Sequence, residues 1–243
     1  MNSLVGKRFA GHQAEKAVAP SLNPSIQVTP ALLTSGQQAQ LSITLPTTSQ
    51  VSTTGTLTVG FTSAVSGVSN DPAIVFTGTG TRTATANFVL GANAASFANG
   101  QSSLTFQTGT TAGTLKFTLS FANGQTVSKS FDITPAAVQI ISSSAVKQSP
   151  YLVINLSAYD NTYSAGKLLF NFYDTKGALL TPGGISIDET QDFHNYFFLN
   201  NQAGGTFGLQ AKFPVSGDIT TVGAADVMVQ NASGQSQTQH LTF

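Results

Sequence analysis

The sequence predicts an all-β protein in which two antiparallel β-sandwiches follow one another, preceded by an extended N-terminal arm. Three observations predict this class. Apolar residues alternate with Thr, Ser and other polar residues along many short segments, as in half-buried strands. Gly and Asn punctuate these segments, and no helix of about ten or more residues is expected. The 40% of hydrophobic residues can fill real cores, whereas charged residues are only 8%, against about 25% in an average domain.

Residues 1–23 differ from the rest of the chain and form the predicted arm. They carry Lys7, Arg8, Glu15 and Lys16 and show no strand alternation. They contain no continuous apolar stretch typical of an intact signal peptide. The segment is interpreted either as a flexible linker or as an assembly arm that docks on a neighbouring copy. The apolar side chains that would dock are Leu4, Val5, Phe9 and Val18.

Residues 24–134 are predicted to form the first sandwich. Leu41, Ile43 and Leu45, for example, share one face of a strand because successive side chains point to opposite faces. The Asn-Gly pairs at 99–100 and 123–124 predict tight hairpin turns. Short strands at this spacing are typical of one sandwich. The predicted strands are 25–29, 40–45, 56–62, 73–76, 82–90, 103–108, 114–121 and 126–133.

Residues 135–243 are predicted to form the second sandwich. The boundary is placed at residues 134–137, where Pro135 follows the last strand of the first series, because proline does not continue a central strand. The connection is short, which predicts little hinge freedom. The predicted strands are 138–141, 151–157, 167–173, 184–188, 195–199, 206–213, 226–229 and 237–242.

Several segments resemble a known type of domain. The first half contains DPAIVF at 71–76, TRT at 81–83, FVL at 88–90 and LTFQTGTTAGTL at 104–115, and the second half ends with VMVQNASGQS at 227–236. Together they resemble immunoglobulin-like modules found in tandem in large exported proteins of soil bacteria. The resemblance implies a non-catalytic spacer, adhesion or assembly unit, and it brings no catalytic residues.

Composition excludes several classes of function. The formal net charge is zero, so the chain lacks the basic surface that binds nucleic acid. There is no run of about 18 apolar residues that would make a transmembrane helix. The absence of cysteine excludes disulfides and thiolate catalysis. His12, His194 and His240 show no metal-binding spacing. The prediction is therefore a protein that is not an enzyme, has no cofactor and no metal, and is secreted or displayed at a cell surface.

Two segments of the second half concentrate acidic and aromatic residues, at 159–163 and at 188–198. In one interpretation, Phe193, Tyr196 and Phe198 fill the core. In another, Asp188, Glu189 and Asp192 hold calcium, which prefers several oxygen ligands. In a third, loops of the second sandwich bind a glycan or another ligand, since recognition often lies on loops. The candidate ligand-binding residues are Tyr159, Asp160, Tyr163, Asp192, His194 and Tyr196.

The leading functional hypothesis is a structural or adhesive subunit whose partners are copies of itself or neighbouring domains of a larger surface protein. Exposed strand edges can add a strand from a neighbour, and low charge weakens repulsion between copies. A glycan- or ligand-binding module is the alternative. A third possibility is an accessory domain of a hydrolase whose chemistry lies on another domain.

Overall fold

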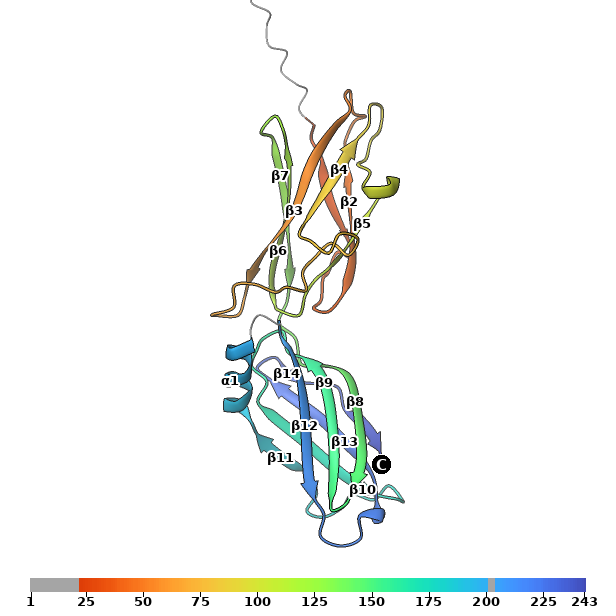
Figure 1. The fold of residues 1–243 in the computed structure, drawn as a ribbon, viewed down its shortest axis with the longest axis vertical. Helices are drawn as coiled ribbons and strands as arrows, with labels where there is room; N and C mark the ends of the chain where they lie inside the picture. Colours follow the sequence, from red (N-terminus) through yellow and green to blue (C-terminus); the bar gives the residue numbers. More distant parts are fainter. Residues whose placement is uncertain (1–21, 201–203) are drawn as a thin grey trace, which may run out of the picture.

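The computed structural model describes residues 22–200 and 204–243. Two β-sandwiches lie end to end, with the strands of each running roughly along the long axis (Figure 1). Every sheet is antiparallel, so the predicted all-β class is confirmed. One α-helix, α1 (Thr190–Asn200), interrupts the series of strands. The prediction that no helix of about ten residues would form is therefore wrong.

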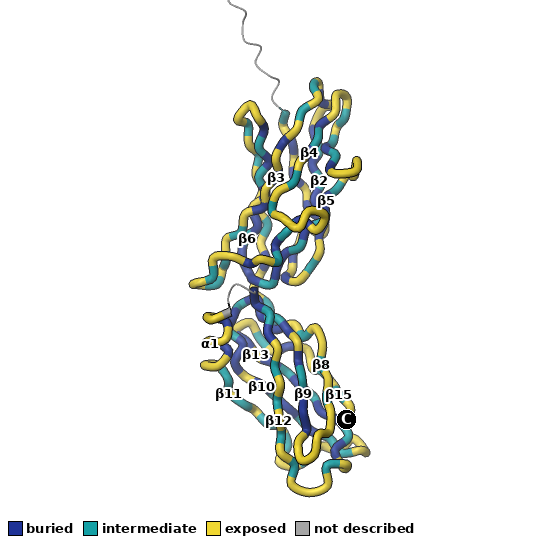
Figure 2. Tube along the Cα trace, in the orientation of Figure 1, coloured by how far each residue is buried: buried dark blue, intermediate teal, exposed yellow. Residues whose placement is uncertain are grey.

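The first sandwich packs a sheet of strand order β1-β2-β5 on a sheet of order β4-β3-β6-β7. Its strands are β1 (Ser25–Thr29), β2 (Gln38–Thr44), β3 (Thr53–Ser63), β4 (Thr83–Phe88), β5 (Leu104–Gln107), β6 (Gly113–Phe121) and β7 (Thr126–Ile133). A single 3-10 turn, η1 (Ala98–Gly100), precedes β5. Alternation explains the core: Leu41, Ile43 and Phe117 are fully buried, while the neighbouring polar residues Ser42, Thr44 and Thr118 are only partly buried. Figure 2 shows this alternation of buried and exposed positions along the strands.

The second sandwich packs a sheet of order β12-β9-β8 on a sheet of order β11-β10-β13, with β14 and β15 both paired to β13. Its strands are β8 (Gln139–Gln148), β9 (Tyr151–Tyr159), β10 (Lys167–Asp174), β11 (Ile185–Asp188), β12 (Thr206–Pro214), β13 (Val222–Asn231), β14 (Gly234–Gln235) and β15 (Gln239–Thr242). A 3-10 turn, η3 (Ile219–Thr221), precedes β13. Counted from its own first strand, this sandwich repeats the strand order of the first one.

Two predicted strands are absent. Residues 195–199 belong to α1, because Phe193 and Phe197 are four positions apart and pack on the core together. Tyr196 and Phe198 are 37% and 70% exposed, so the expectation that they fill the core is wrong. Residues 73–76 form no regular strand, although Phe76 makes isolated bridges to Thr81 and Phe106.

The two Asn-Gly turns differ from each other. Asn99 and Gly100 both have positive φ, at 57° and 73°, but they lie in η1, between strands β4 and β5 of different sheets, so the predicted hairpin does not form there. In the β6–β7 hairpin only Gly124 has positive φ, at 86°. There the Asn123 side chain accepts a hydrogen bond from the Gln125 amide at 2.9 Å instead, which is the local turn bond that Asn commonly makes.

Candidate functional site: the domain junction and the open edge of the second sandwich

A network of buried polar groups joins the two sandwiches, and Asp71 is its centre on the first domain. The Asp71 side chain is fully buried. Its carboxylate accepts hydrogen bonds from the backbone amides of Ala73 at 3.0 Å and Thr110 at 2.6 Å. The Thr111 hydroxyl donates a third, at 2.7 Å. These donors compensate for the loss of hydration of the carboxylate.

Asn161 of the second domain fixes the connection between the domains. Its side-chain Nδ2 donates to the Thr134 carbonyl at 2.9 Å, and its Oδ1 accepts from the Ala136 amide at 2.9 Å. The same Nδ2 donates to the Ser35 hydroxyl at 2.9 Å, and the Asn161 carbonyl accepts from the Ala112 amide at 2.8 Å. One residue thus holds both sides of Pro135 and two loops of the first sandwich.

Asp160 orders the loop that presents Asn161. Its Oδ2 accepts from the Ser164 and Ala165 amides, each at 2.6 Å. Its Oδ1 accepts from the side chain of Asn231 at 2.7 Å. Among the residues that the structure describes, every buried side-chain nitrogen or oxygen has a hydrogen-bond partner, so the junction meets the usual requirement for a native buried network.

Tyr163 links this network to α1. Its hydroxyl is 3.0 Å from that of Thr111, and its ring lies 5.0 Å from the ring of Phe197. Burial, followed by the charges of Asp71 and Asp160, raises the pKa of Tyr163 to about 12, against a lowering effect of the Thr111 hydrogen bond. Tyr163 is therefore neutral throughout the ordinary pH range.

The candidate ligand-binding residues of the sequence separate into two groups. Tyr159, Asp160 and Tyr163 lie at the junction, where Asp160 and Tyr163 are buried and the Tyr159 hydroxyl donates to the Ser35 carbonyl at 2.8 Å. They form no exposed loop surface, because donors of its own domain enclose Asp160 while Tyr159 and Tyr163 bond to the first sandwich. The others, Asp192, His194 and Tyr196, lie on α1. The candidate assembly residues Leu4, Val5, Phe9 and Val18 lie outside the described residues.

The acidic residues near the start of α1 do not form a cation site. In the described part of the chain, no three His, Cys, Asp or Glu side chains gather in a way that could hold a metal ion. Asp188 instead accepts from the amide and hydroxyl of Thr190, at 3.1 and 2.6 Å, and these bonds lower its pKa. A hydrogen bond with Asp192 raises the pKa of Glu189, because the two carboxyls lie side by side.

A cleft runs along one edge of the second sandwich, between edge strands β11 and β12. Beside α1 it contains a cavity of ≈ 430 Å³, lined by the apolar side chains of Leu168, Phe207 and Leu209 together with Glu189, Asp192 and Tyr196 of the helix region. A second cavity of ≈ 580 Å³ lies toward the far end of the domain, beside Leu180, Ile185 and Val215. Phe213 lines both cavities, and we call the two together the edge cleft.

Sequence reasoning missed the edge cleft and the role of Asp71. Alternation in residues 206–213 predicts which side chains of β12 face inward, but it does not predict that no described segment pairs with the outer edge of this strand. Asp71 had a weak signal: it is a lone acid beside a proline in a segment rich in Thr, Ser and Gly. On the outer face of the second sandwich, Asp226 also accepts from Tyr173 at 2.8 Å and lies 2.6 Å from the His240 ring.

Comparison with known proteins gives no family for this chain. No family model matches it, and no curated protein sequence matches it. Solved structures with partial similarity include the dimeric latent PorU from Porphyromonas gingivalis, at 14% identity and a TM-score of 0.27 over 97% of this chain and 21% of that one. They also include the Yersinia pseudotuberculosis adhesin InvE, at 11% identity and a TM-score of 0.28 over 91% of this chain and 60% of that one.

A third similar structure is the class 5 fimbriae chaperone CfaA, at 9% identity and a TM-score of 0.28, covering 89% of this chain and 99% of that one. This chain spans less than two thirds of the length of PorU and of InvE. At such scores none of these proteins assigns a function to this chain. In the described ranges, no helix is long and apolar enough to cross a membrane.

Proposed function

We propose that this chain is a non-catalytic structural or adhesive module of an exported or surface-displayed protein, which associates with copies of itself through its N-terminal arm or its strand edges. The observation that carries this proposal is the junction. Most connections between domains of one chain permit relative motion. Here one residue, Asn161, binds the linker on both sides and one loop of the first sandwich through its side chain, and a second loop through its backbone carbonyl.

Apolar packing reinforces the polar junction. Val65 and Val68, in the loop after β3 of the first sandwich, pack against the hydrophobic core of the second. A Cβ atom added at Gly205 would meet the backbone carbonyl of Thr110 at 2.8 Å and would also clash with that of Asp160. The two domains therefore approach closely at this point. A stiff pair of sandwiches suits a spacer or a subunit that must hold its ends apart.

Solution scattering tests the proposal. The wild-type chain should scatter X-rays as a single stiff rod, and light scattering should show a mass that increases with concentration. Asn161→Ala should broaden the distribution of interdomain angles, because the linker loses its side-chain partners. Asn155→Ala is the matched control, since Asn155 lies on the exposed side of β9 and bonds only within its own sheet. A strictly monomeric wild-type chain at every concentration would contradict self-association.

Ligand binding is a second candidate function, because Asp192 and Tyr196 of the predicted ligand set line the cavity beside α1. A carboxylate and a tyrosine beside an apolar pocket can hydrogen-bond and stack on a sugar ring. A glycan array is the direct measurement. Binding that Tyr196→Ala abolishes would favour this function, and an array without hits would exclude glycans as ligands.

A further inference from the structure

The two sandwiches share one strand order but differ at one edge. In the first sandwich the free edge of β5 is covered by residues 75–77: the Gln107 amide donates to the Val75 carbonyl at 2.8 Å, and the Thr77 amide donates to the Thr105 carbonyl at 3.0 Å. Phe76 lies between these two hydrogen bonds, and the side chains of both Ile74 and Phe76 are fully buried. The chain thus supplies its own apolar segment to close this edge.

In the second sandwich the equivalent strand is β12, which in the described structure pairs with β9 and with no other strand. Its inward side chains Leu209, Ala211 and Phe213 are only partly buried, whereas Leu104 and Phe106 of β5 are 7% and 0% exposed. The edge cleft occupies the position that Ile74 and Phe76 fill in the first sandwich. It is therefore shaped for an extended segment with apolar side chains, which would extend a sheet edge.

We propose that the edge cleft receives residues 1–21 of a second copy of this chain, an inference that rests on the self-association proposed above. The length of the segment is sufficient, since β12 has nine residues and the arm has 21 outside the described structure. Four of its side chains, Leu4, Val5, Phe9 and Val18, are apolar enough to enter the two cavities.

Charge favours the same occupant. The edge cleft is lined by the carboxylates of Glu189, Asp192 and Asp218 and by one ammonium group, that of Lys212. The arm carries Lys7, Arg8 and Lys16 against a single acid, Glu15. Lys7 and Arg8 directly precede Phe9, so an apolar anchor in the cavity beside α1 would bring these cations near the pair Glu189 and Asp192. Opposite charges aligned in this way fix register and partner.

The position of the arm explains why a second copy supplies it. The described chain begins at the end of the first sandwich that is remote from the second (Figure 1), where the Leu22 carbonyl accepts from the Gln125 side chain. The ≈ 580 Å³ cavity lies at the opposite end of the molecule, beside Pro182 and Ser216. In an end-to-end row of molecules, each arm would enter the neighbour's cleft directly. Such head-to-tail contact does not close on itself and produces a filament.

Engineered cysteines give the sharpest test, because the natural chain has none. Three full-length variants are made, each with one cysteine in the arm: Val5→Cys, Phe9→Cys or Val18→Cys. Each is mixed under mild oxidation with a full-length chain that carries Leu209→Cys. A cross-linked pair containing one chain of each kind is expected for at least one of the three. Val146→Cys is the matched control, since Val146 is 49% exposed on β8, the opposite edge strand of the same sheet.

Cross-links that form with Val146→Cys and not with Leu209→Cys would overturn the proposal. A further experiment places both cysteines in the same chain and keeps the protein dilute. Cross-links that form only within single chains would also overturn the proposal, because the arm would then dock on its own molecule.

Association measurements separate this proposal from self-association in general. Deleting residues 1–21 removes the proposed occupant of the cleft and should weaken association at least about tenfold. Leu209→Glu should have the same effect, because it places a charge in an apolar cavity. Val146→Glu, on the opposite edge strand, should leave association unchanged. A chain that still associates after the deletion would keep the proposed function and overturn this inference. Reversing Lys7 and Arg8 to Glu should weaken association, and adding Glu189→Lys and Asp192→Lys should restore it. A lack of rescue would contradict the proposed register.

Discussion

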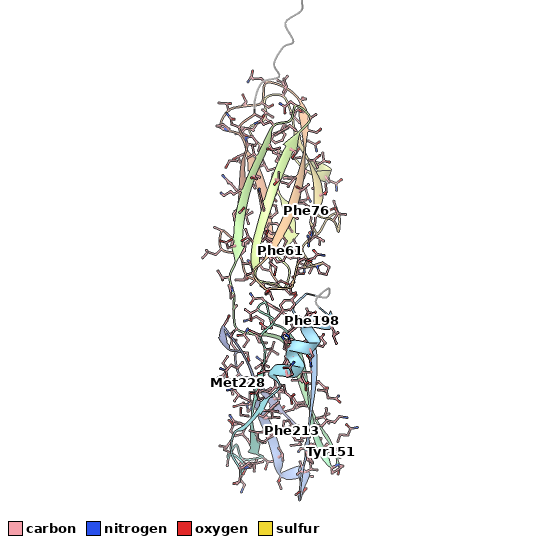
Figure 3. The ribbon with its side chains drawn as sticks, turned by 90° about the vertical axis from the view of Figure 1, so that its left-hand side faces the viewer. Phe61, Phe76, Tyr151, Phe198, Phe213 and Met228 are labelled. Atoms are coloured by element: carbon pink, nitrogen blue, oxygen red, sulfur yellow. The ribbon has the colours of Figure 1, made fainter. Side chains whose placement is uncertain are left out.

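The two sandwiches have the same strand order, yet one closes its edge and the other leaves it open. The difference arises in the connection between the third and fourth strands. In the first domain residues 64–82 are long enough to return along β5 and place Phe76 between the sheets, whereas in the second the connection is only residues 175–184. Figure 3 labels Phe76 in the upper domain and Phe213 in the lower one. Strand order therefore does not determine which edges are available.

The largest effect is expected from removing the side chain that closes the first edge. Phe76→Ala should destabilise the first domain by about 3–5 kcal/mol, because it leaves a cavity beside the rings of Phe106 and Phe117. Denaturant unfolding followed by circular dichroism measures this loss. All five tyrosines lie at or after residue 151, and three of them, Tyr151, Tyr173 and Tyr196, lie away from the bonds that Tyr159 and Tyr163 make to the first domain. The unfolding of the second domain, followed by tyrosine fluorescence, should change little.

Removing the central carboxylate of the junction should have the next largest effect. Asp71→Ala leaves the amides of Ala73 and Thr110 and the Thr111 hydroxyl without an acceptor. A loss of about 2–4 kcal/mol is expected, since each unsatisfied buried donor costs about 1–3 kcal/mol and some gain water. The same denaturant titration measures it. Asp132→Ala is the control, because Asp132 accepts one hydrogen bond at the exposed surface, and an equal loss there would contradict the special role of Asp71.

The junction should weaken at high pH through Tyr163. Its folded-state pKa is about 12, against an ordinary value of 10.0, so the neutral form is favoured in the folded protein. The resulting stability is complete below pH 10 and is lost as the pH rises from 10 to 12, by at most about 2.7 kcal/mol. Unfolding titrations across this range measure it. Tyr163→Phe should abolish most of this dependence at a cost of about 1 kcal/mol near neutral pH.

The smallest effect should come from the open edge. Phe213→Ala should cost about 1–2 kcal/mol, less than Phe76→Ala, because Phe213 is only partly buried even though its ring contacts those of Phe170 and Phe172. Tyrosine fluorescence during unfolding gives the value. A loss as large as that of Phe76→Ala would mean that the second edge is as closed as the first, and it would remove the basis of the comparison.

Much of the fold could be predicted from the sequence because period-two alternation is a local property. The segments around Leu41, Leu57 and Phe117 became strands close to their predicted bounds. The helix α1 was missed because the density of aromatic residues at 193–198 suggested a strand. The spacing of Phe193 and Phe197, with Asp188 accepting from the Thr190 amide just before the helix, was the signal for a helix start.

The candidate site was harder to predict because it depends on contacts between distant segments. Asp160 and Tyr163 look like loop residues in the sequence, but Asp160 accepts hydrogen bonds from Ser164, Ala165 and Asn231. Tyr163 packs in the core of the second sandwich and reaches Thr111 of the first. The edge cleft depends on the length of the connection before β11 and on the space that the helix leaves uncovered. Neither quantity follows from the pattern of one strand. The residues that line the cleft, such as Leu209 and Ala211, look in the sequence like ordinary core positions.

The binding of the linker by Asn161 has a mechanical consequence. Residues 134 and 136 are both hydrogen-bonded to this one side chain, so a pull on the two ends of the molecule cannot simply stretch the connection. The load passes instead into strands that run along the direction of pulling, where many backbone hydrogen bonds must break together rather than one after another. Extension under force should therefore begin with the rupture of a whole sandwich.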